Sequence, residues 1–175
     1  MISNDLDIDR WRRELAVRGR IQIPGFLQPA AAEALTDELA TRVPWQLAER
    51  SGGTSHTTPR GAYPQGEDYD RLIRAGYAAA TTGYQFAYDS YMLLKAAREG
   101  WDPDLLVHGV LRFLNTPDFI DFARLLGGDP AIRHVMAQAT RYRPGHYLMP
   151  HEDLEETEQR RYAFVINLGR GWQPD

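Results

Sequence analysis

The chain has 175 residues, and its 20 lysine and arginine residues stand against 24 aspartate and glutamate residues, which gives a formal net charge of −4. A chain of this length fits one domain, so we expect a single domain over residues 1–175. No cysteine is present, which excludes disulfides, iron–sulfur clusters and a cysteine nucleophile and leaves histidine and carboxylates as metal ligands. Because the chain has no basic field, nucleic acid and a membrane surface are not expected partners.

The first residues, Met1–Asp7, are acidic and lack the apolar core of a secretory signal. No apolar run approaches the roughly 18 residues that a membrane span needs. We therefore expect a cytoplasmic protein.

Helical spacing of apolar residues dominates the first 128 residues. Pro29 and Pro117 both suit the first turn of a helix, and Gly127–Gly128 suits a helix end. We expect helices over residues 7–17, 29–42, 105–114 and 117–126.

Three further segments lie in this helical half. Tyr84, Tyr88 and Tyr91 recur at helical spacing, so we expect a helix whose tyrosines face the core. Alternation over residues 21–23 predicts a short strand. The Gly-, Pro- and Thr-rich stretch 51–67 predicts a long loop, and loops of this length often act as lids or binding loops.

After residue 128 the pattern changes to strand-like alternation. We expect strands over 132–142, 146–149 and 161–168, and the last has the strongest signal. Because the helices come first and the strands after, the pattern predicts an α+β fold, with a helical half at 1–128 and a β half at 129–175.

The main candidate for chemistry is the motif His151-Glu152-Asp153. In an extended segment, residues i and i+2 point to the same side, so His151 and Asp153 can reach one metal ion together. An imidazole and a carboxylate are two of the three ligands of the facial triad in non-haem Fe(II) oxygenases. The motif alone has low specificity, and a solvated acidic turn is the alternative. His146 points to the opposite strand face from His151 and does not fit as a substitute ligand.

The residues around this motif follow a definite order. A strand ends at Tyr142, a Pro-Gly turn follows, and a second strand enters the His-x-Asp motif. An acidic loop, an arginine-led apolar strand and Trp172 come next. Over about residues 140–175, this order resembles the Fe(II)/2-oxoglutarate-dependent dioxygenases of the prolyl 4-hydroxylase-like family, and within it the bacterial proline-hydroxylase-like branch.

The resemblance implies N-terminal helices packed on a double-stranded β-helix, a jelly-roll or cupin-like core, with only its first half in this chain. It implies that His151 and Asp153 hold Fe(II). It also implies that Tyr142 hydrogen-bonds the cosubstrate 2-oxoglutarate and that Tyr147 lines the substrate side. Ascorbate is an optional further cofactor, no catalytic residue separate from the metal ligands is expected, and the substrate is a prolyl residue in a protein or peptide.

The family's second metal-binding histidine, and the basic residue that pairs with 2-oxoglutarate, are not found in this sequence. We therefore expect the 175-residue chain to be an incomplete and inactive fragment on its own. The strand at 161–168 would then leave an open apolar edge, which favours a homodimer or strand exchange. Two alternatives stay open: a non-catalytic half-barrel that binds a partner or acts as a scaffold, and a metal-dependent enzyme of another class, such as a cupin-like isomerase.

Overall fold

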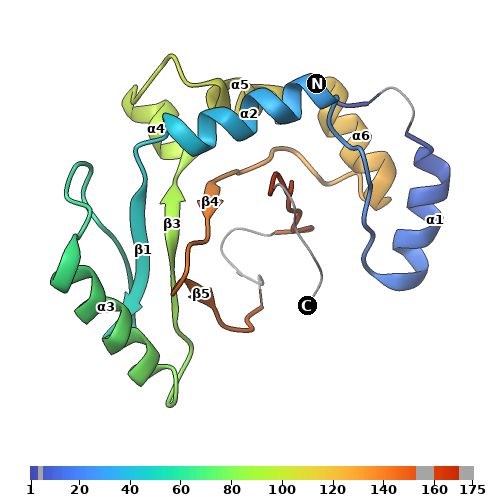
Figure 1. The fold of residues 1–175 in the computed structure, drawn as a ribbon. Helices are drawn as coiled ribbons and strands as arrows, with labels where there is room; N and C mark the ends of the chain where they lie inside the picture. The colour runs from blue at the N-terminus through green and yellow to red at the C-terminus, as the bar shows by residue number, and fades with distance from the viewer. Residues whose placement is uncertain (4–5, 153–159, 170–175) are drawn as a thin grey trace. The chain divides into compact units, whose positions relative to one another are not determined.

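The structure is a computed structural model that describes residues 1–3, 6–152 and 160–169 (Figure 1). Within these ranges the chain forms six helices and five strands, and the strands pair antiparallel throughout. The expected α+β class is therefore confirmed. None of the described helices is both long and apolar enough to cross a membrane.

The described residues divide into two compact units, each assembled from separated stretches of chain. The helical unit comprises described residues of 1–42, 103–136 and 160–169. The sheet unit comprises residues 43–102 and 137–152. The expectation of a single domain stays a prediction.

Four helices form the helical unit, and apolar spacing predicts all four. They are α1 (Ile8–Arg18), α2 (Pro29–Thr41), α5 (Leu106–Leu114) and α6 (Pro117–Gly127). The ends of α6 follow the expected signals. The Thr116 side chain accepts a hydrogen bond from the backbone N–H of Phe119, and Gly128 ends the helix with a φ of 67°, which glycine adopts without strain.

A buried carboxylate caps the start of α5. The N-cap residue Leu105 offers no side-chain hydrogen bond. Glu38 on α2 instead accepts from the backbone N–H groups of Leu106 and Val107, at 2.8 and 3.0 Å. Glu38 is only 3% exposed, and Arg42 Nη1 lies 3.2 Å from its Oε1. Because the first N–H groups of a helix have no partner within it, this carboxylate ties α2 to α5.

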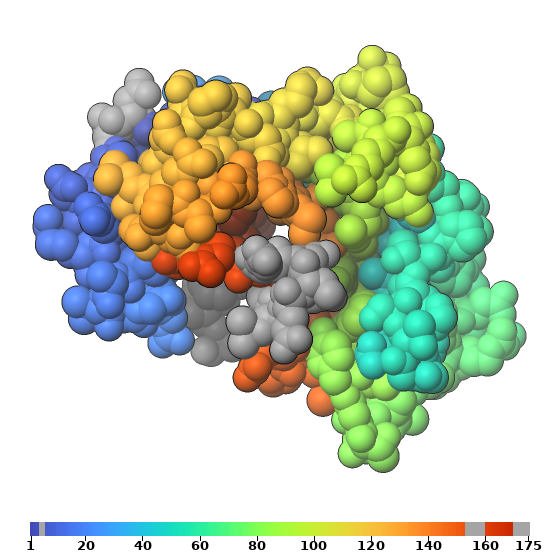
Figure 2. Space-filling view, turned by 180° about the vertical axis from the view of Figure 1, so that it is seen from behind, coloured from blue at the N-terminus to red at the C-terminus, as the bar shows by residue number. Residues whose placement is uncertain are grey.

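One sheet and two helices form the sheet unit. The strands are β1 (Gln46–Ser51), β2 (Thr54–Thr57), β3 (Phe86–Tyr91), β4 (Ala139–Arg141) and β5 (Tyr147–Leu148), and the helices are α3 (Gly66–Ala79) and α4 (Leu93–Glu99). The strand order is β2-β1-β3-β4, and β5 also pairs with β3. α3 packs against β1 and β3 (Figure 1). β1 is mostly buried whereas β2 is exposed, and the exposed end of their hairpin is drawn in turquoise at the surface in Figure 2.

The register of β3 assigns its side chains to two faces. Asp89 lies opposite Arg141 on β4, so both point to one face, which we call the Asp89 face. α3 covers this face, where the Tyr77 hydroxyl donates to a backbone carbonyl of the chain leading into β5. Phe86 and Tyr88 alternate with Asp89 and point to the opposite face, which we call the Tyr88 face.

A bulge interrupts the chain segment that follows the edge of β3. β4 ends at Arg141 and β5 begins at Tyr147, and residues 142–146 stand opposite Tyr88 alone. A backbone hydrogen bond of 2.8 Å closes the turn inside the bulge, and Gly145 has a φ of 88°. A type II turn requires a positive φ at this position. The expected Pro-Gly turn is therefore confirmed, and it sits inside a β-bulge.

The tyrosine-rich segment is a strand, so the expected helix is wrong. Tyr88 and Tyr91 lie on β3, and Tyr84 comes just before it. The same segment also has period two through its aromatic residues, and pairing on both edges of β3 decides in favour of the strand. The expected loop at 51–67 is also wrong in part, because it contains β2 and the first residues of α3.

Three expected strands need correction. Residues 21–23 form no strand, and the strand expected at 132–142 shrinks to Ala139–Arg141, whereas the one at 146–149 is confirmed as β5. Residues 161–168 alternate but are not a strand, since their backbone pairs with none of the described strands. In that segment the Tyr162 hydroxyl donates to the carbonyl oxygen of residue 127 at 2.6 Å.

Candidate functional site

A row of aromatic rings runs along the Tyr88 face of the sheet. The ring centroids of Tyr142 and Tyr88 are 5.6 Å apart, and those of Tyr88 and Phe86 are 5.3 Å apart. Tyr84 follows at 5.9 Å from Phe86, and His151 ends the row at 5.7 Å from Tyr84. Two of the predicted site residues, Tyr142 and His151, therefore belong to the same row.

Strand geometry explains how the row forms. Side chains two residues apart on a strand share a face, which lines up Phe86 with Tyr88. Tyr142 follows β4 directly, and continuing the register of the β3–β4 pair sets it opposite Tyr88. Aromatic side chains on facing positions of neighbouring strands attract each other, so the row also stabilises the pairing of β3 with β4.

The Tyr142 hydroxyl can donate a hydrogen bond to a ligand. Its side chain is 50% exposed. Partial burial raises the pKa of Tyr142 above its ordinary value, and the neighbouring hydroxyls of Tyr88 and Tyr84 raise it further. The phenol therefore keeps its proton at neutral pH, the form that donates to a carboxylate.

A backbone carbonyl contacts the ring of His151. Its Nδ1 lies 3.1 Å from the carbonyl oxygen of Met149. Because a carbonyl oxygen can only accept, Nδ1 is the donor in this contact, and in a neutral imidazole the lone pair is then on Nε2. A histidine that ligates a metal through Nε2 has this arrangement. The geometry of His151 therefore fits its predicted role.

The second predicted ligand, Asp153, lies outside the described residues. Among the residues that the structure describes, no three histidine or carboxylate side chains gather into a group that could hold a metal ion. The pairing of His151 with Asp153 at one metal stays a prediction.

Tyr147 lies apart from the aromatic row. It belongs to β5 on the Asp89 face, and its ring stacks on Tyr77 of α3 with centroids 4.7 Å apart. Burial raises the pKa of Tyr147. The structure does not bring Tyr147 together with Tyr142 and His151, and its substrate-side role stays a prediction.

A second cluster of polar side chains surrounds Asp89, whose side chain is fully buried. Oδ2 of Asp89 lies 2.7 Å from Arg141 Nη2 and 3.0 Å from Arg143 Nε. The Tyr63 hydroxyl donates to Oδ1 of Asp89 at 2.5 Å. His146 Nε2 is 3.8 Å from the same oxygen, which is beyond hydrogen-bond distance. Two arginines thus share one carboxylate.

The two remaining titratable side chains of the cluster, His146 and Tyr63, carry no charge at neutral pH. Burial holds the pKa of His146 below its ordinary value. Burial also raises the pKa of Tyr63, and its hydrogen bond to Asp89 raises it further. The two arginines and Asp89 therefore leave one positive charge in excess. His146 and His151 lie on different faces, as their odd spacing predicts.

The sequence analysis missed the Asp89 cluster. Arg141 and Arg143 flank Tyr142, so alternation alone could have placed both arginines on the face opposite that tyrosine. Asp89 lies in the segment expected to be helical, which hid its alignment with Arg141. Phe86 was missed as part of the row for the same reason.

Compared with known proteins, the sequence matches no family model, no curated protein and no solved structure. A family assignment therefore depends on the motif residues and on where the structure places them.

Proposed function

We propose that this chain provides the metal and cosubstrate face of an Fe(II)- and 2-oxoglutarate-dependent oxygenase of the prolyl 4-hydroxylase-like type, acting on a prolyl residue in a protein or peptide. The aromatic row carries the proposal, because it sets Tyr142 and His151 along one face of one antiparallel sheet. In this proposal the sheet belongs to a double-stranded β-helix, and the Tyr88 face is the interior of its barrel.

Each described residue of the row has a role in the proposal. His151, together with Asp153, holds Fe(II), and the hydrogen bond from Nδ1 to the backbone keeps the lone pair on Nε2. Bound Fe(II) and 2-oxoglutarate supply the chemistry that uses O₂ to hydroxylate a C–H bond. Tyr142 donates its hydroxyl proton to a carboxylate of 2-oxoglutarate, a charge-assisted bond. Phe86 and Tyr88 keep water from the surface between the two.

The exposed part of the row suits the proposed substrate. Tyr142 and Tyr84 are 50% and 37% exposed, respectively. Aromatic side chains at a surface commonly form the walls against which proline-rich segments dock. A prolyl ring packed on the tyrosines would lie along the line that joins the cosubstrate residue to the metal ligand.

Anaerobic titration of the chain with Fe(II) and 2-oxoglutarate tests the proposal. We expect the visible absorption of an Fe(II)–2-oxoglutarate chelate to appear and to vanish in His151→Ala. His134→Ala is the matched control, because His134 is an exposed histidine of the helical unit, and it should keep the absorption. Tyr142→Phe should weaken 2-oxoglutarate binding by about tenfold, the usual effect of one lost charge-assisted hydrogen bond.

Two results would count against the oxygenase. One is an absorption that persists unchanged in His151→Ala, which would place the iron elsewhere. The other is no absorption at any Fe(II) concentration, in which case a non-catalytic binding or scaffold module describes the chain better.

A further inference from the structure

The Asp89 face carries an open cleft of about 320 Å³ that the proposed oxygenase chemistry does not use. Its lining combines two cations, three aromatic rings and the start of a helix. The lining residues are Trp45, Tyr63, Pro64, Gln65, Gly66, Tyr69, Arg141 and Arg143. All of them belong to the sheet unit.

Asp89 orients both arginines from beneath the cleft. Arg141 binds Oδ2 of Asp89 through Nε at 2.8 Å and through Nη2 at 2.7 Å. Arg143 reaches the same oxygen through Nε at 3.0 Å and Oδ1 through Nη2 at 3.4 Å. A guanidinium has five N–H donors, so one carboxylate leaves donors of both arginines for another acceptor. The side chains of Arg141 and Arg143 are 36% and 39% exposed, respectively.

Aromatic rings fix the planes of these guanidiniums. The ring of Trp45 lies 4.8 Å from the guanidinium carbon of Arg141. The rings of Tyr63 and Tyr69 lie 5.2 and 5.3 Å from that of Arg143. Rings stacked on the faces of an arginine leave its N–H edge as the accessible part. The arginines are therefore arranged in advance for a planar acceptor.

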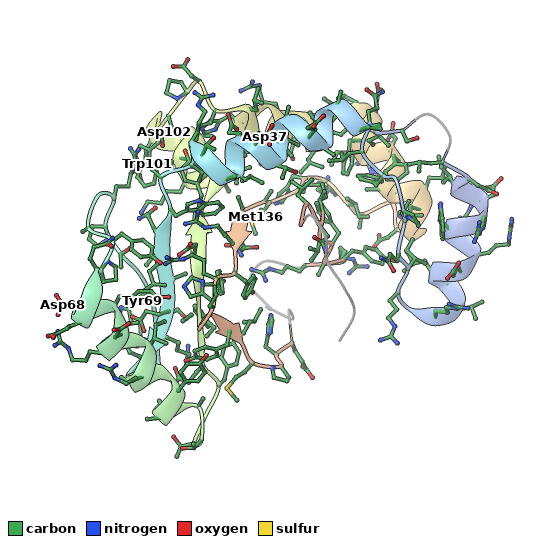
Figure 3. All side chains as sticks on the ribbon, viewed as in Figure 1. Asp37, Asp68, Tyr69, Trp101, Asp102 and Met136 are labelled. Atoms are coloured by element: carbon green, nitrogen blue, oxygen red, sulfur yellow. The ribbon has the colours of Figure 1, made fainter. Side chains whose placement is uncertain are left out.

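The start of α3 adds backbone donors to the same cleft. The N-cap residue, Gln65, makes no side-chain capping hydrogen bond, and both Gln65 and Gly66 line the cleft. The first N–H groups of a helix favour an anion. Figure 3 shows Tyr69 directed toward the sheet and Asp68 directed away from it.

The net charge of the residues around the cleft favours a singly charged anion. The two arginines and Asp89 leave one positive charge, which a singly charged anion neutralises. A singly charged planar group fits this balance better than a doubly charged phosphate, and the edge of one arginine can bind both oxygens of a carboxylate in parallel.

We propose that this cleft is a carboxylate-binding site, for a free organic acid or for an acidic side chain of a peptide. The site lies on the face opposite Tyr142 and His151, so it stands independently of the proposed oxygenase function. Neither ligand needs a metal at this cleft.

Titration of the metal-free chain with propionate, followed by ¹H–¹⁵N NMR, tests the proposal. We expect the backbone amide of Gly66 and the indole N–H of Trp45 to shift together and to saturate. Arg143→Gln should weaken binding by about tenfold or more, since it removes charge-assisted hydrogen bonds. Arg74→Gln is the matched control on exposed α3 surface and should leave the affinity unchanged.

A second variant and a second ligand keep the test decisive if Arg143→Gln does not fold. Arg143→Lys keeps the charge beside Asp89 but lacks the fork of donors, and it should still bind propionate more weakly than the unaltered chain. The peptide acetyl-Ala-Glu-Ala-amide replaces propionate in a parallel titration, and tighter binding of one of the two identifies the source of the carboxylate. Tyr142→Phe should leave the propionate affinity unchanged, which separates this site from the oxygenase site.

Three results would overturn the proposal. The first is an unaltered chain whose Gly66 and Trp45 signals do not move with propionate or with the peptide. The second is equal affinity in the unaltered chain and in Arg143→Lys. The third is tighter binding of inorganic phosphate than of either carboxylate, which would reverse the argument from charge balance.

Discussion

Replacing Asp89 with asparagine tests the central polar cluster of the sheet unit. The substitution keeps the size of the side chain but removes the charge that faces Arg141 and Arg143. Asparagine also presents an NH₂ group to donors that need an acceptor, among them the Tyr63 hydroxyl. Two cations then face each other across a site that no longer holds a counter-charge.

The structure sets the size of the effect. Removing one partner of a buried ion pair costs about 3–5 kcal/mol, because the remaining charge stays uncompensated. Asp89 is fully buried, but the arginine side chains are 36% and 39% exposed, so water can solvate part of their charge. We therefore expect a loss near the lower limit, about 3 kcal/mol, which is a large fraction of the roughly 5–15 kcal/mol that stabilises a typical domain.

Urea unfolding followed by circular dichroism measures this loss. The midpoint should fall in Asp89→Asn while the dependence on urea stays that of the unaltered chain. Asp70→Asn is the matched control, since Asp70 is an exposed aspartate on α3, and its effect should stay within about 0.5 kcal/mol. In the double variant with Arg141→Gln, the loss should be smaller than the sum of the two single losses, because the second change removes one uncompensated cation.

A loss below about 1 kcal/mol in Asp89→Asn would refute this reasoning, since that is the range of a neutral hydrogen bond. Simple additivity with Arg141→Gln would refute it as well. Either result would mean that the arginines are solvated well enough to need no counter-charge, and the arrangement of the cleft would lose its physical basis.

Three further predictions concern stability. Glu38→Gln should lower the free energy of unfolding by about 1–3 kcal/mol in urea unfolding, because one of two buried helix N–H groups loses its acceptor. Because the pKa of His146 lies below its ordinary 6.5, the unfolded chain binds a proton near pH 6 that the folded chain does not. The free energy of unfolding should therefore fall as the pH drops below 6.5. Urea midpoints measured across pH should show a weaker fall in His146→Gln. Gly128→Ala should lower the free energy of unfolding by about 1 kcal/mol, because φ is 67° there, whereas Gly109→Ala, inside α5, should raise it. Thermal unfolding measures both changes, and equal effects at the two glycines would contradict the backbone argument.

The helices of the helical unit could be predicted from sequence because their signals are local. Thr116 as a cap, Pro29 and Pro117 in first turns, and Gly128 as a stop act within a few residues of the backbone they satisfy. Glu38 could not be predicted as the cap of α5, since it lies far from that helix in the sequence and acts only once α2 is in place.

The strands were harder to predict than the helices, because a strand forms only where a neighbouring strand pairs with it. The segment from Tyr84 to Tyr91 fits helical and strand spacing about equally, and pairing with β1 and β4 decides between them. Residues 161–168 have the strongest alternation, yet they remain unpaired by any described strand. Alternation shows which side chains could share a face, but not whether a neighbouring backbone is there to bond.

In the candidate site, the spacing of two residues in the sequence predicted their relative directions where both lie in one short segment of chain. The turn between Tyr142 and His151 and the opposite directions of His146 and His151 could both be predicted. The residues that connect Tyr142 with His151 come from β3 and from Tyr84 just before it, and Asp89 also lies on β3. Neither the row nor the cluster could therefore be predicted before the register was known.

The residues where β4 enters the bulge, 141–143, serve both faces of the sheet. Tyr142 on one face is bonded through single peptide planes to Arg141 and Arg143 on the other. Successive side chains of an extended segment point to opposite faces, so the same three residues supply the Tyr142 ring to the Tyr88 face and two guanidiniums to the Asp89 face. A slip of one residue in the register of this segment would exchange the side chains presented to the two faces, so the pairing of β3 with β4 fixes both groups at once.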